Sequence, residues 1–264
     1  MLRSFLKCVF CLLPSLLFAS SDVISNNKKD VLHQFVRFDP PTDHFTQYVF
    51  QNWENETFDV FEEVKDKESI AIDLGAWIGT TAIWLSKNFH HVIAVEPDSR
   101  SIECLRQNLA ASDCPNVSIC ERPVSNSSHK VIFGPQGAEL NQSISCIKNR
   151  ADNAKEYAVK SITFKQLLYD YIFANDDLRN RRVSFIKCDI EGGEENILED
   201  VLHFAYNNKC KVYMSFHLGW WKSKKITDFE HLFKHFKTPI PGNDVCAYLT
   251  NNPFGSVLLE PVDV

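Results

Sequence analysis

The alternation of apolar and amphipathic segments between residues 69 and 96 constrains the fold more than any other feature of the chain. The run SIAIDLG at 69–75 is typical of a buried strand, and HVIAVE at 91–96 is a second continuous apolar strand. Between them, TTAIWLSKN at 80–88 places Ala82, Ile83 and Leu85 at helical spacing. A strand, a helix and a strand in this order form a βαβ unit, which predicts a parallel sheet.

The same alternation continues along the rest of the chain. Further strands are expected at 116–120, 182–189 and 211–217, and helices at 100–112, 163–173, 194–204 and 227–236. A hairpin insertion is expected from Val131 to about Ser145, and CAYLT at 246–250 is expected to pair with SVLLEPV at 256–262 as an antiparallel closure of the sheet. The sequence thus predicts an α/β fold: a doubly wound, Rossmann-like, mostly parallel seven-stranded sheet with helices on both faces.

The first 21 residues have the layout of a secretory signal. Arg3 and Lys7 flank an apolar run from Cys8 to Phe18, which small residues follow. This segment is interpreted as a signal peptide or a signal anchor, because the run is short for a membrane span of about 20 residues. Residues 22–45 are interpreted as a polar arm and 46–264 as one large domain. A secreted route is also favoured by sequons at Asn55, Asn116, Asn126 and Asn141.

The charge of the chain argues against nucleic acid as a partner. The formal net charge is -6, and acids and bases alternate along the chain. Neutralising a phosphate backbone requires a clustered basic surface, which this pattern does not supply.

The loop AIDLGAWIGTT after the first strand indicates a nucleotide-type ligand with cationic groups. Gly75 and Gly79 permit a tight turn between strand and helix. A dinucleotide fingerprint would have a second glycine where Trp77 stands, and Asp73 adds a negative charge that a pyrophosphate would not tolerate. Glu96, about 20 residues on, can accept hydrogen bonds from ribose hydroxyls. S-adenosylmethionine, with its ammonium and sulfonium, fits this loop better than NAD does.

Four candidate site residues follow predicted strands. Asp73, Glu96, Asp189 and His217 fall at strand ends that a parallel sheet brings to one edge, where such sheets bind ligands. Methyl transfer to an oxygen needs positioning of the acceptor and a base for its proton, and Asp189 or His217 could be that base. Glu191 could point to the same cleft or to a backbone amide.

Two further interpretations concern the acids around this edge. Glu194 and Glu195 fall in the first turn of a predicted helix, where negative charge is favourable against the helix dipole, so they are interpreted as serving the helix start. Asp189, Glu191 and His217 have the chemistry to ligate a divalent ion that orients a vicinal diol. Their spacing does not require one, and no metal is predicted.

Several segments, taken together, resemble the FkbM-type methyltransferases, a branch of the class I S-adenosylmethionine-dependent enzymes. They are AIDLGAWIGTTAIWL, VIAVEPDS, IKCDIEGGEENIL and YMSFH, in that order, and the resemblance extends from about Trp53 to the C-terminus. It implies that 46–264 is a class I methyltransferase domain and that Asp73, Gly75 and Gly79 hold the methionine and ribose end of the cofactor. It also implies that Glu96 binds the ribose hydroxyls.

Two smaller points also depend on the resemblance. The segment CERPVSN at 120–126 would face the adenine, with Arg122 and Val124 as candidates. The chain departs from the family pattern at Ser215, where an acid is usual, and at Lys165, where an aspartate is common.

The sequence therefore predicts an S-adenosylmethionine-dependent O-methyltransferase that acts on a hydroxyl of a sugar, glycan or small metabolite. The catalytic candidates are Asp189, Glu191 and His217. A secreted or membrane-associated binding protein on the same fold, without transfer activity, is the alternative that the two departures motivate. An NAD-dependent oxidoreductase is a third possibility that the loop disfavours. The expected location is the secretory pathway, secreted or anchored, with a cytosol-facing anchor left open because the cofactor is made in the cytosol.

Overall fold

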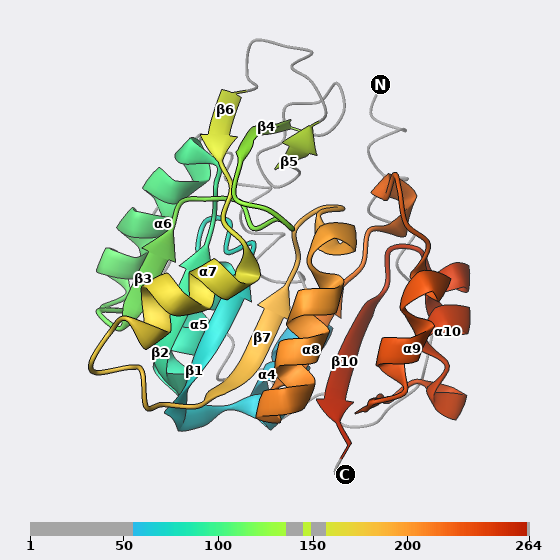
Figure 1. The fold of residues 1–264 in the computed structure, drawn as a ribbon. Coiled ribbons are helices and arrows are strands. Elements are labelled where there is room, and N and C mark those ends of the chain that lie inside the picture. The colour runs from blue at the N-terminus through green and yellow to red at the C-terminus, as the bar shows by residue number, and fades with distance from the viewer. Residues whose placement is uncertain (1–54, 136–144, 149–156, 263–264) are drawn as a thin grey trace.

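A seven-stranded sheet forms the centre of the molecule (Figure 1). The computed structural model describes residues 55–135, 145–148 and 157–262, so the predicted signal segment and arm lie outside the described residues. The strand order is β3-β2-β1-β7-β8-β10-β9. The first five strands in this order run parallel to one another, and β10 runs antiparallel to β8 and β9. The strands are β1 Asp66–Leu74, β2 Phe89–Val95, β3 Val117–Cys120, β7 Val183–Cys188, β8 Lys211–Ser215, β9 Phe236–Lys237 and β10 Ser256–Pro261. The predicted fold class is confirmed.

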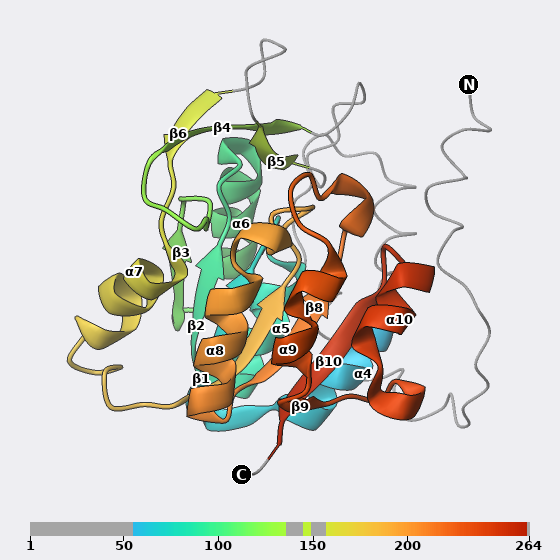
Figure 2. The ribbon, with the colours of Figure 1, turned by 45° about the vertical axis from the view of Figure 1, so that its right-hand side comes forward.

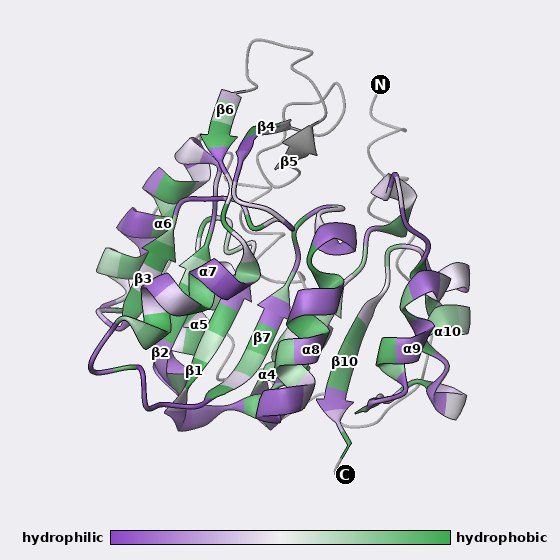
Figure 3. Ribbon diagram, in the orientation of Figure 1, coloured by the Kyte–Doolittle hydropathy of each residue, from purple (hydrophilic) through white to green (hydrophobic). Residues whose placement is uncertain are grey.

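Helices cover both faces of this sheet, as Figure 2 shows. They are α4 Asn55–Val64, α5 Thr80–Asn88, α6 Ser99–Ala111, α7 Phe164–Leu168, α8 Leu198–Asn208, α9 Glu230–Phe233 and α10 Val245–Asn251. Helices α4, α5 and α6 pack on one face, and α7 to α10 pack on the other. Ala71 joins the first group and Ile70 and Ile72 the second, because successive strand residues point to opposite faces. A strand buried on both sides must be apolar throughout, which explains the unbroken runs in the sequence (Figure 3).

Short helical turns connect several of these elements. They are the π-helical turn η1 Tyr169–Phe173 and the 3₁₀ turns η2 Glu194–Asn196, η3 Leu218–Trp220, η4 Ile226–Phe229 and η5 Pro241–Asn243. The helix predicted from residue 163 begins with Thr163 as its cap, whose side chain accepts a hydrogen bond from the Gln166 N–H. This is the arrangement that threonine favours at a helix start.

The predicted hairpin insertion is part of a second, three-stranded sheet. Its strands are β4 Lys130–Pro135, β5 Ser145–Lys148 and β6 Tyr157–Lys160, all antiparallel, in the order β5-β4-β6. This sheet lies beyond the carboxyl ends of β2 and β3 (Figure 1). The Tyr157 hydroxyl donates to the Pro97 carbonyl over 2.5 Å and so ties the second sheet to the end of β2. The insertion therefore stands beside the edge where ligands are expected.

The prediction of a strand at CAYLT is wrong, because this segment lies inside helix α10. Asp244 caps the helix by accepting a hydrogen bond from the Ala247 N–H over 2.8 Å. Val245, Cys246 and Leu249 then fall on one buried face. The closing strand β10 instead pairs with β8 and β9. A five-residue apolar run has too few positions to reveal its period, and the aspartate before it was the better signal.

Candidate active site

The loop between β1 and α5 is held in a conformation that glycine makes possible. Gly75 has φ +85° and Gly79 has φ +101°, both in the left-handed region. A Cβ at Gly75 would lie 1.8 Å from the carbonyl oxygen of Asp189, at the end of the neighbouring strand β7. The predicted tight turn is thus present, and at Gly75 the missing side chain lets the loop lie against β7.

Asp73 is buried at the end of β1 and contacts the chain itself. The Thr81 hydroxyl donates to its Oδ2 over 2.6 Å, and the Lys187 Nζ lies 3.5 Å from its Oδ1. Burial raises the pKa of Asp73, and the charge of Lys187 and the Thr81 hydrogen bond oppose that rise. Its predicted contact with the cofactor stays a prediction.

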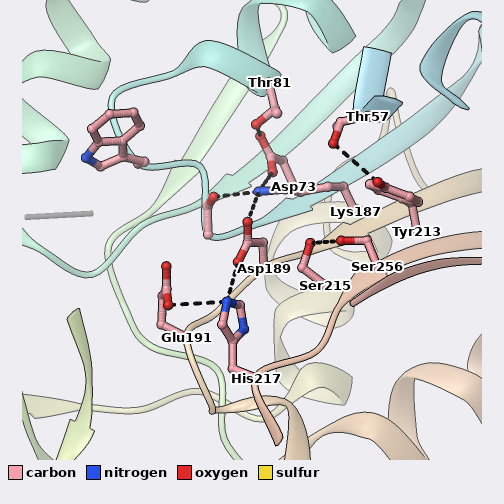
Figure 4. Close-up of polar contacts among 12 residues, drawn as sticks. Thr57, Asp73, Thr81, Lys187, Asp189, Glu191, Tyr213, Ser215, His217 and Ser256 are labelled. Atoms are coloured by element: carbon pink, nitrogen blue, oxygen red, sulfur yellow. Dashed lines mark hydrogen bonds and ion pairs between the residues drawn. The ribbon is translucent and has the colours of Figure 1, made fainter. Parts of the chain in front are cut away.

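Lys187 links the two sides of the site, and the sequence analysis gave it no role beyond its place in the segment IKCDIEGGEENIL. Its side chain is buried in β7, and its Nζ donates to the Gly75 carbonyl over 2.9 Å. The same Nζ lies 3.9 Å from Asp189 Oδ2, as well as facing Asp73 (Figure 4). The available signal was a lysine inside an otherwise apolar strand, because a buried lysine requires paired charges.

Glu96 binds two backbone amides of the surrounding loops. The Trp77 N–H donates to Oε2 and the Asp98 N–H donates to Oε1, each over 2.8 Å. Burial raises the pKa of Glu96 to about 7; the two backbone hydrogen bonds and Lys187 act in the opposite direction, and Asp98 adds to the rise. Trp77 itself has φ +48°, so this carboxylate holds a loop residue in an uncommon conformation.

Arg122 and Val124 contact other parts of the chain. The guanidinium of Arg122 donates to the carbonyls of Ser161, over 2.6 Å, and Lys160, over 3.2 Å, at the end of the second sheet. Val124 is buried in the core and forms a parallel bridge with Ile162. Their predicted contact with adenine stays a prediction.

The three catalytic candidates lie together beyond the ends of β7 and β8. His217 Nε2 lies 3.3 Å from Glu191 Oε2 and 3.7 Å from Asp189 Oδ1, and the carboxylates converge on the ring in Figure 4. These two oxygens are buried and have no hydrogen-bond partner among the described residues. Glu191 also has φ +55°, a left-handed conformation that is uncommon for a residue other than glycine. The structure thus brings all three residues to one point and leaves two carboxylate oxygens unused.

Glu194 holds the other side of the His217 ring. Its side chain is fully buried. Its Oε1 lies 3.0 Å from His217 Nδ1 and also accepts a hydrogen bond from the Gly192 N–H over 3.1 Å. Its Oε2 accepts a hydrogen bond from the Trp221 Nε1–H over 3.0 Å. Glu195 accepts three backbone N–H groups at 222–224 and the Ser223 hydroxyl. The glutamates do lie in the first turn, η2, as expected. Their interpretation as residues that only serve the helix start is incomplete, because apart from the Gly192 contact their side chains bind segments 23 to 29 positions further along the chain.

The acids around His217 decide the charge of its ring. Burial alone would lower the pKa of His217, but the Glu194 hydrogen bond and the charges of Asp189, Glu194 and Glu191 raise it to about 9. Burial and the Asp189 charge raise the pKa of Glu191 to about 8, although His217 opposes this. The acids around it thus favour the protonated form of the ring. A protonated ring cannot accept a proton, which favours Asp189 over His217 as the base candidate.

An aromatic surface borders the acid cluster. Trp220 stacks on His217, with ring centroids 5.0 Å apart and planes 7° from parallel. Phe254, 43% exposed, meets Trp220 edge-on at 5.5 Å. The cluster therefore has a polar side of carboxylates and an apolar side of aromatic rings.

The two departures from the family pattern lie apart from these contacts. Ser215 shares a 2.9 Å hydroxyl–hydroxyl hydrogen bond with Ser256, across the β8–β10 pair. Lys165 is exposed on α7. Neither side chain is among the groups that surround His217 in the described part of the chain.

A doubly wound sheet with a glycine loop after β1 and acids at its strand ends is the arrangement of the Rossmann-like folds that bind ligands beyond the carboxyl ends of their strands. The chain belongs to the FkbM methyltransferase family: the Methyltransferase FkbM domain matches residues 73–238. No curated protein matches the chain in sequence.

Solved structures of other methyltransferases are similar to this chain at low sequence identity. FkbM from Methylobacillus flagellatus KT shares 13% identity over 88% of this chain and 57% of its own, with a TM-score of 0.44. An rRNA methylase from Streptococcus thermophilus shares 13% sequence identity over 79% of this chain and 96% of its own, with a TM-score of 0.46. The Streptococcus mutans protein SMU.1697c, described as a putative methyltransferase in complex with SAH, shares 15% sequence identity over 78% of this chain and 96% of its own, with a TM-score of 0.45.

Proposed function

We propose that this protein transfers a methyl group from S-adenosylmethionine to a hydroxyl oxygen of a sugar, a glycan or a small metabolite. Membership of the FkbM methyltransferase family supports group transfer. The observation that carries the choice of oxygen as acceptor is the position of Asp189. Its carboxylate follows β7, next to the Gly75 loop, with one buried oxygen that no donor in the described chain occupies.

The residues at the ends of β1 and β2 suit a cofactor with a ribose and positive charges. Asp73, Glu96 and Asp189 supply negative charge around the loop, which suits a cation and opposes a pyrophosphate. Glu96 uses each oxygen for one backbone amide, and a carboxylate oxygen has a second lone pair for a hydroxyl. When bound, S-adenosylmethionine supplies an electrophilic methyl group whose leaving group departs neutral. The chain need only orient the acceptor and remove its proton.

Asp189 would remove that proton. Its Oδ2 faces Lys187 at 3.9 Å and its Oδ1 faces His217 Nε2 at 3.7 Å, so these two groups hold the carboxylate in place. A carboxylate base of this kind contributes about 10²- to 10⁴-fold to a transfer rate.

The aromatic surface favours an acceptor with an apolar face. A sugar ring presents C–H groups on one face and hydroxyls at its rim. In this proposal Trp220 and Phe254 cover the C–H face of the sugar, and the acids bind its hydroxyls. This division supports a carbohydrate acceptor over a small aliphatic alcohol.

Two measurements test the proposal. Calorimetric titration should show binding of S-adenosylmethionine and little of NAD; tight binding of NAD alone would instead indicate an oxidoreductase. Incubation with a panel of sugars and glycans should release S-adenosylhomocysteine in wild-type protein. If S-adenosylmethionine binds but no acceptor leads to release of S-adenosylhomocysteine, the protein is better described as a binding protein that retains the fold.

We also propose that residues 1–21 direct the chain into the secretory pathway. None of the helices in the described part of the chain is long and apolar enough to cross a membrane. Asn126 is exposed and could report on a lumenal location, whereas the Asn116 amide donates to the Ser86 and Phe89 carbonyls. N-terminal sequencing and glycosidase treatment of the expressed protein would decide between cleavage and anchoring; a cytosol-facing anchor would leave Asn126 unmodified.

A further inference from the structure

We propose that Asp189, Glu191 and His217 form a binding site for one divalent metal ion. One ligand atom from each residue lies within 4.8 Å of the others. His217 Nε2 is 3.3 Å from Glu191 Oε2 and 3.7 Å from Asp189 Oδ1. Metal–ligand bonds of about 2.1 Å place adjacent ligands roughly 3.0 to 3.4 Å apart. The two distances from Nε2 are thus within a few tenths of an ångström of this range, and the two carboxylate oxygens, within 4.8 Å of each other, can close on the same ion by side-chain rotation.

The state of the two carboxylates points independently to a cation. Asp189 Oδ1 and Glu191 Oε2 are each buried without a hydrogen-bond partner among the described residues, and they are the two oxygens that face Nε2. Buried carboxylate oxygens are normally hydrogen-bonded or bound to a metal. Glu194 and Glu195 show the normal case, because donors occupy their oxygens.

Glu194 prepares the ring for this role. The Nδ1–H of His217 donates to its carboxylate. When a metal ion displaces the Nε2 proton, the Nε2 lone pair is therefore directed at Asp189 and Glu191. Trp221 and Gly192 hold Glu194 in turn. A histidine whose second nitrogen is fixed by a carboxylate is the usual arrangement around protein-bound metals.

The ligand set selects the kind of ion. Magnesium and calcium prefer oxygen ligands alone, whereas an imidazole together with two carboxylates suits a transition ion such as Mn²⁺. Three protein ligands leave further positions open. Provided that the proposed transferase function holds, two neighbouring oxygens of the acceptor would occupy them, which makes a vicinal diol the preferred substrate class.

Binding of Mn²⁺ to the full chain tests the site without any transfer assay. Loss of the electron paramagnetic resonance signal of free Mn²⁺ should reveal one saturable site. The double variant Asp189→Asn/Glu191→Gln should lose it. The control Asp200→Asn/Glu199→Gln makes the same two chemical changes on exposed acids of α8 and should bind like wild type. Absence of saturable binding by folded wild type up to about 1 mM, or equal binding by the double variant, would overturn the proposal.

A second pair of variants examines the part played by Glu194. Glu194→Gln should weaken Mn²⁺ binding by about 10- to 100-fold, because the ring loses its carboxylate partner. Glu195→Gln, beside it and equally enclosed, should leave Mn²⁺ affinity within about threefold. Equal affinity in both variants would contradict the positioning role. If the double carboxylate variant does not fold, His217→Gln replaces it and must also lose at least about tenfold in affinity.

The metal site and the transferase function can fail separately. Methyl transfer that persists in a chelator would remove the diol-binding role and leave the transferase intact. A bound Mn²⁺ with no transfer to any acceptor would leave the site and refute the proposed function.

Discussion

The acids at the ends of β1 and β2 differ from those at the ends of β7 and β8 in what they contact. Asp73 accepts the Thr81 hydroxyl and faces Lys187, and Glu96 accepts two backbone N–H groups. Asp189 and Glu191 each keep a buried oxygen without a hydrogen-bond partner in the described chain, and both of these oxygens face His217 Nε2. Asp73 Oδ1 is likewise without a hydrogen-bond partner, but it faces Lys187, which itself donates to the Gly75 carbonyl. The first pair therefore supports the loop between strand and helix, and the second pair surrounds the ring of the third catalytic candidate. Four acids at one sheet edge thus divide into a holding half and a reacting half.

The largest effect should come from the reacting half. Asp189→Asn keeps the shape of the side chain but removes the base, so the transfer rate should fall about 10²- to 10⁴-fold. Affinity for S-adenosylhomocysteine should change by less than about threefold, because the holding half is intact. Release of product and calorimetric binding measure the two quantities, with the exposed Asp200→Asn as control. A loss of affinity that matches the loss of rate would show that Asp189 belongs with the holding half.

A substitution in the loop that the holding half supports should lower the free energy of unfolding. Gly75→Ala imposes φ +85° on an alanine and drives its Cβ into the Asp189 carbonyl, so the free energy of unfolding should fall by more than about 3 kcal/mol. Gly242 has a similar φ of +74° but open space around it, and Gly242→Ala should cost only about 1 kcal/mol. Urea denaturation of both variants measures the two losses, and their difference separates the steric clash at Gly75 from the backbone strain that both positions share. Equal losses would mean that the contact with β7 is unimportant.

Glu194 and Glu195 are expected to separate catalysis from stability. Both are buried in η2, and replacing either by glutamine should reduce the free energy of unfolding by about 1 to 3 kcal/mol. Only Glu194→Gln should also lower the transfer rate of the folded protein, by about tenfold, because only Glu194 contacts His217. Thermal denaturation and rates per folded molecule test this. A similar drop in rate for Glu195→Gln would contradict the division.

Glu96 should make cofactor binding depend on pH. Its raised pKa of about 7 belongs to the free protein, and ribose hydroxyls donate best to the ionised form. Affinity for S-adenosylhomocysteine should therefore fall about tenfold from pH 8 to pH 6, and Glu96→Gln should flatten this profile. Calorimetry across this range measures it. A flat profile in wild type would mean that the ionised carboxylate does not bind the ribose.

The raised pKa of Glu96 affects folding stability in the opposite direction, because stability falls as the pH rises whereas cofactor affinity rises. The folded pKa of Glu96 lies above its ordinary value of 4.5, so its contribution to stability is complete below about pH 4.5 and is lost as the pH rises through about 7. The charges that face it are Asp98, which favours protonation, and Lys187, which opposes it. Unfolding measured from pH 5 to pH 8 with wild type and Glu96→Gln isolates this contribution.

Most of the fold was predictable from sequence, because long segments with a clear period specify it. The runs at 69–75 and 91–96 are unbroken since helices cover both faces, and the intervening helix has its own period. The segment at 246–250 was mispredicted because it is too short for a period to appear. Strand ends also located the site, since the topology alone brings Asp189 and His217 together.

The contacts within the site were harder to predict. Glu194 and Glu195 were placed in the correct turn, but their partners lie 23 to 29 positions further along the chain. Local pattern carries no information about such a partner. Lys187 was overlooked because its neighbours along the strand are apolar, although a charge within a buried strand signals a buried partner.

The position of β10 has a consequence for how the chain folds during synthesis. This strand lies between β8 and β9 in the sheet but follows both in sequence. The ribosome therefore makes two strands before the one that joins them, and until 256–261 emerges β8 presents an open edge to other chains. Aggregation through this edge is therefore expected to be greatest in that interval.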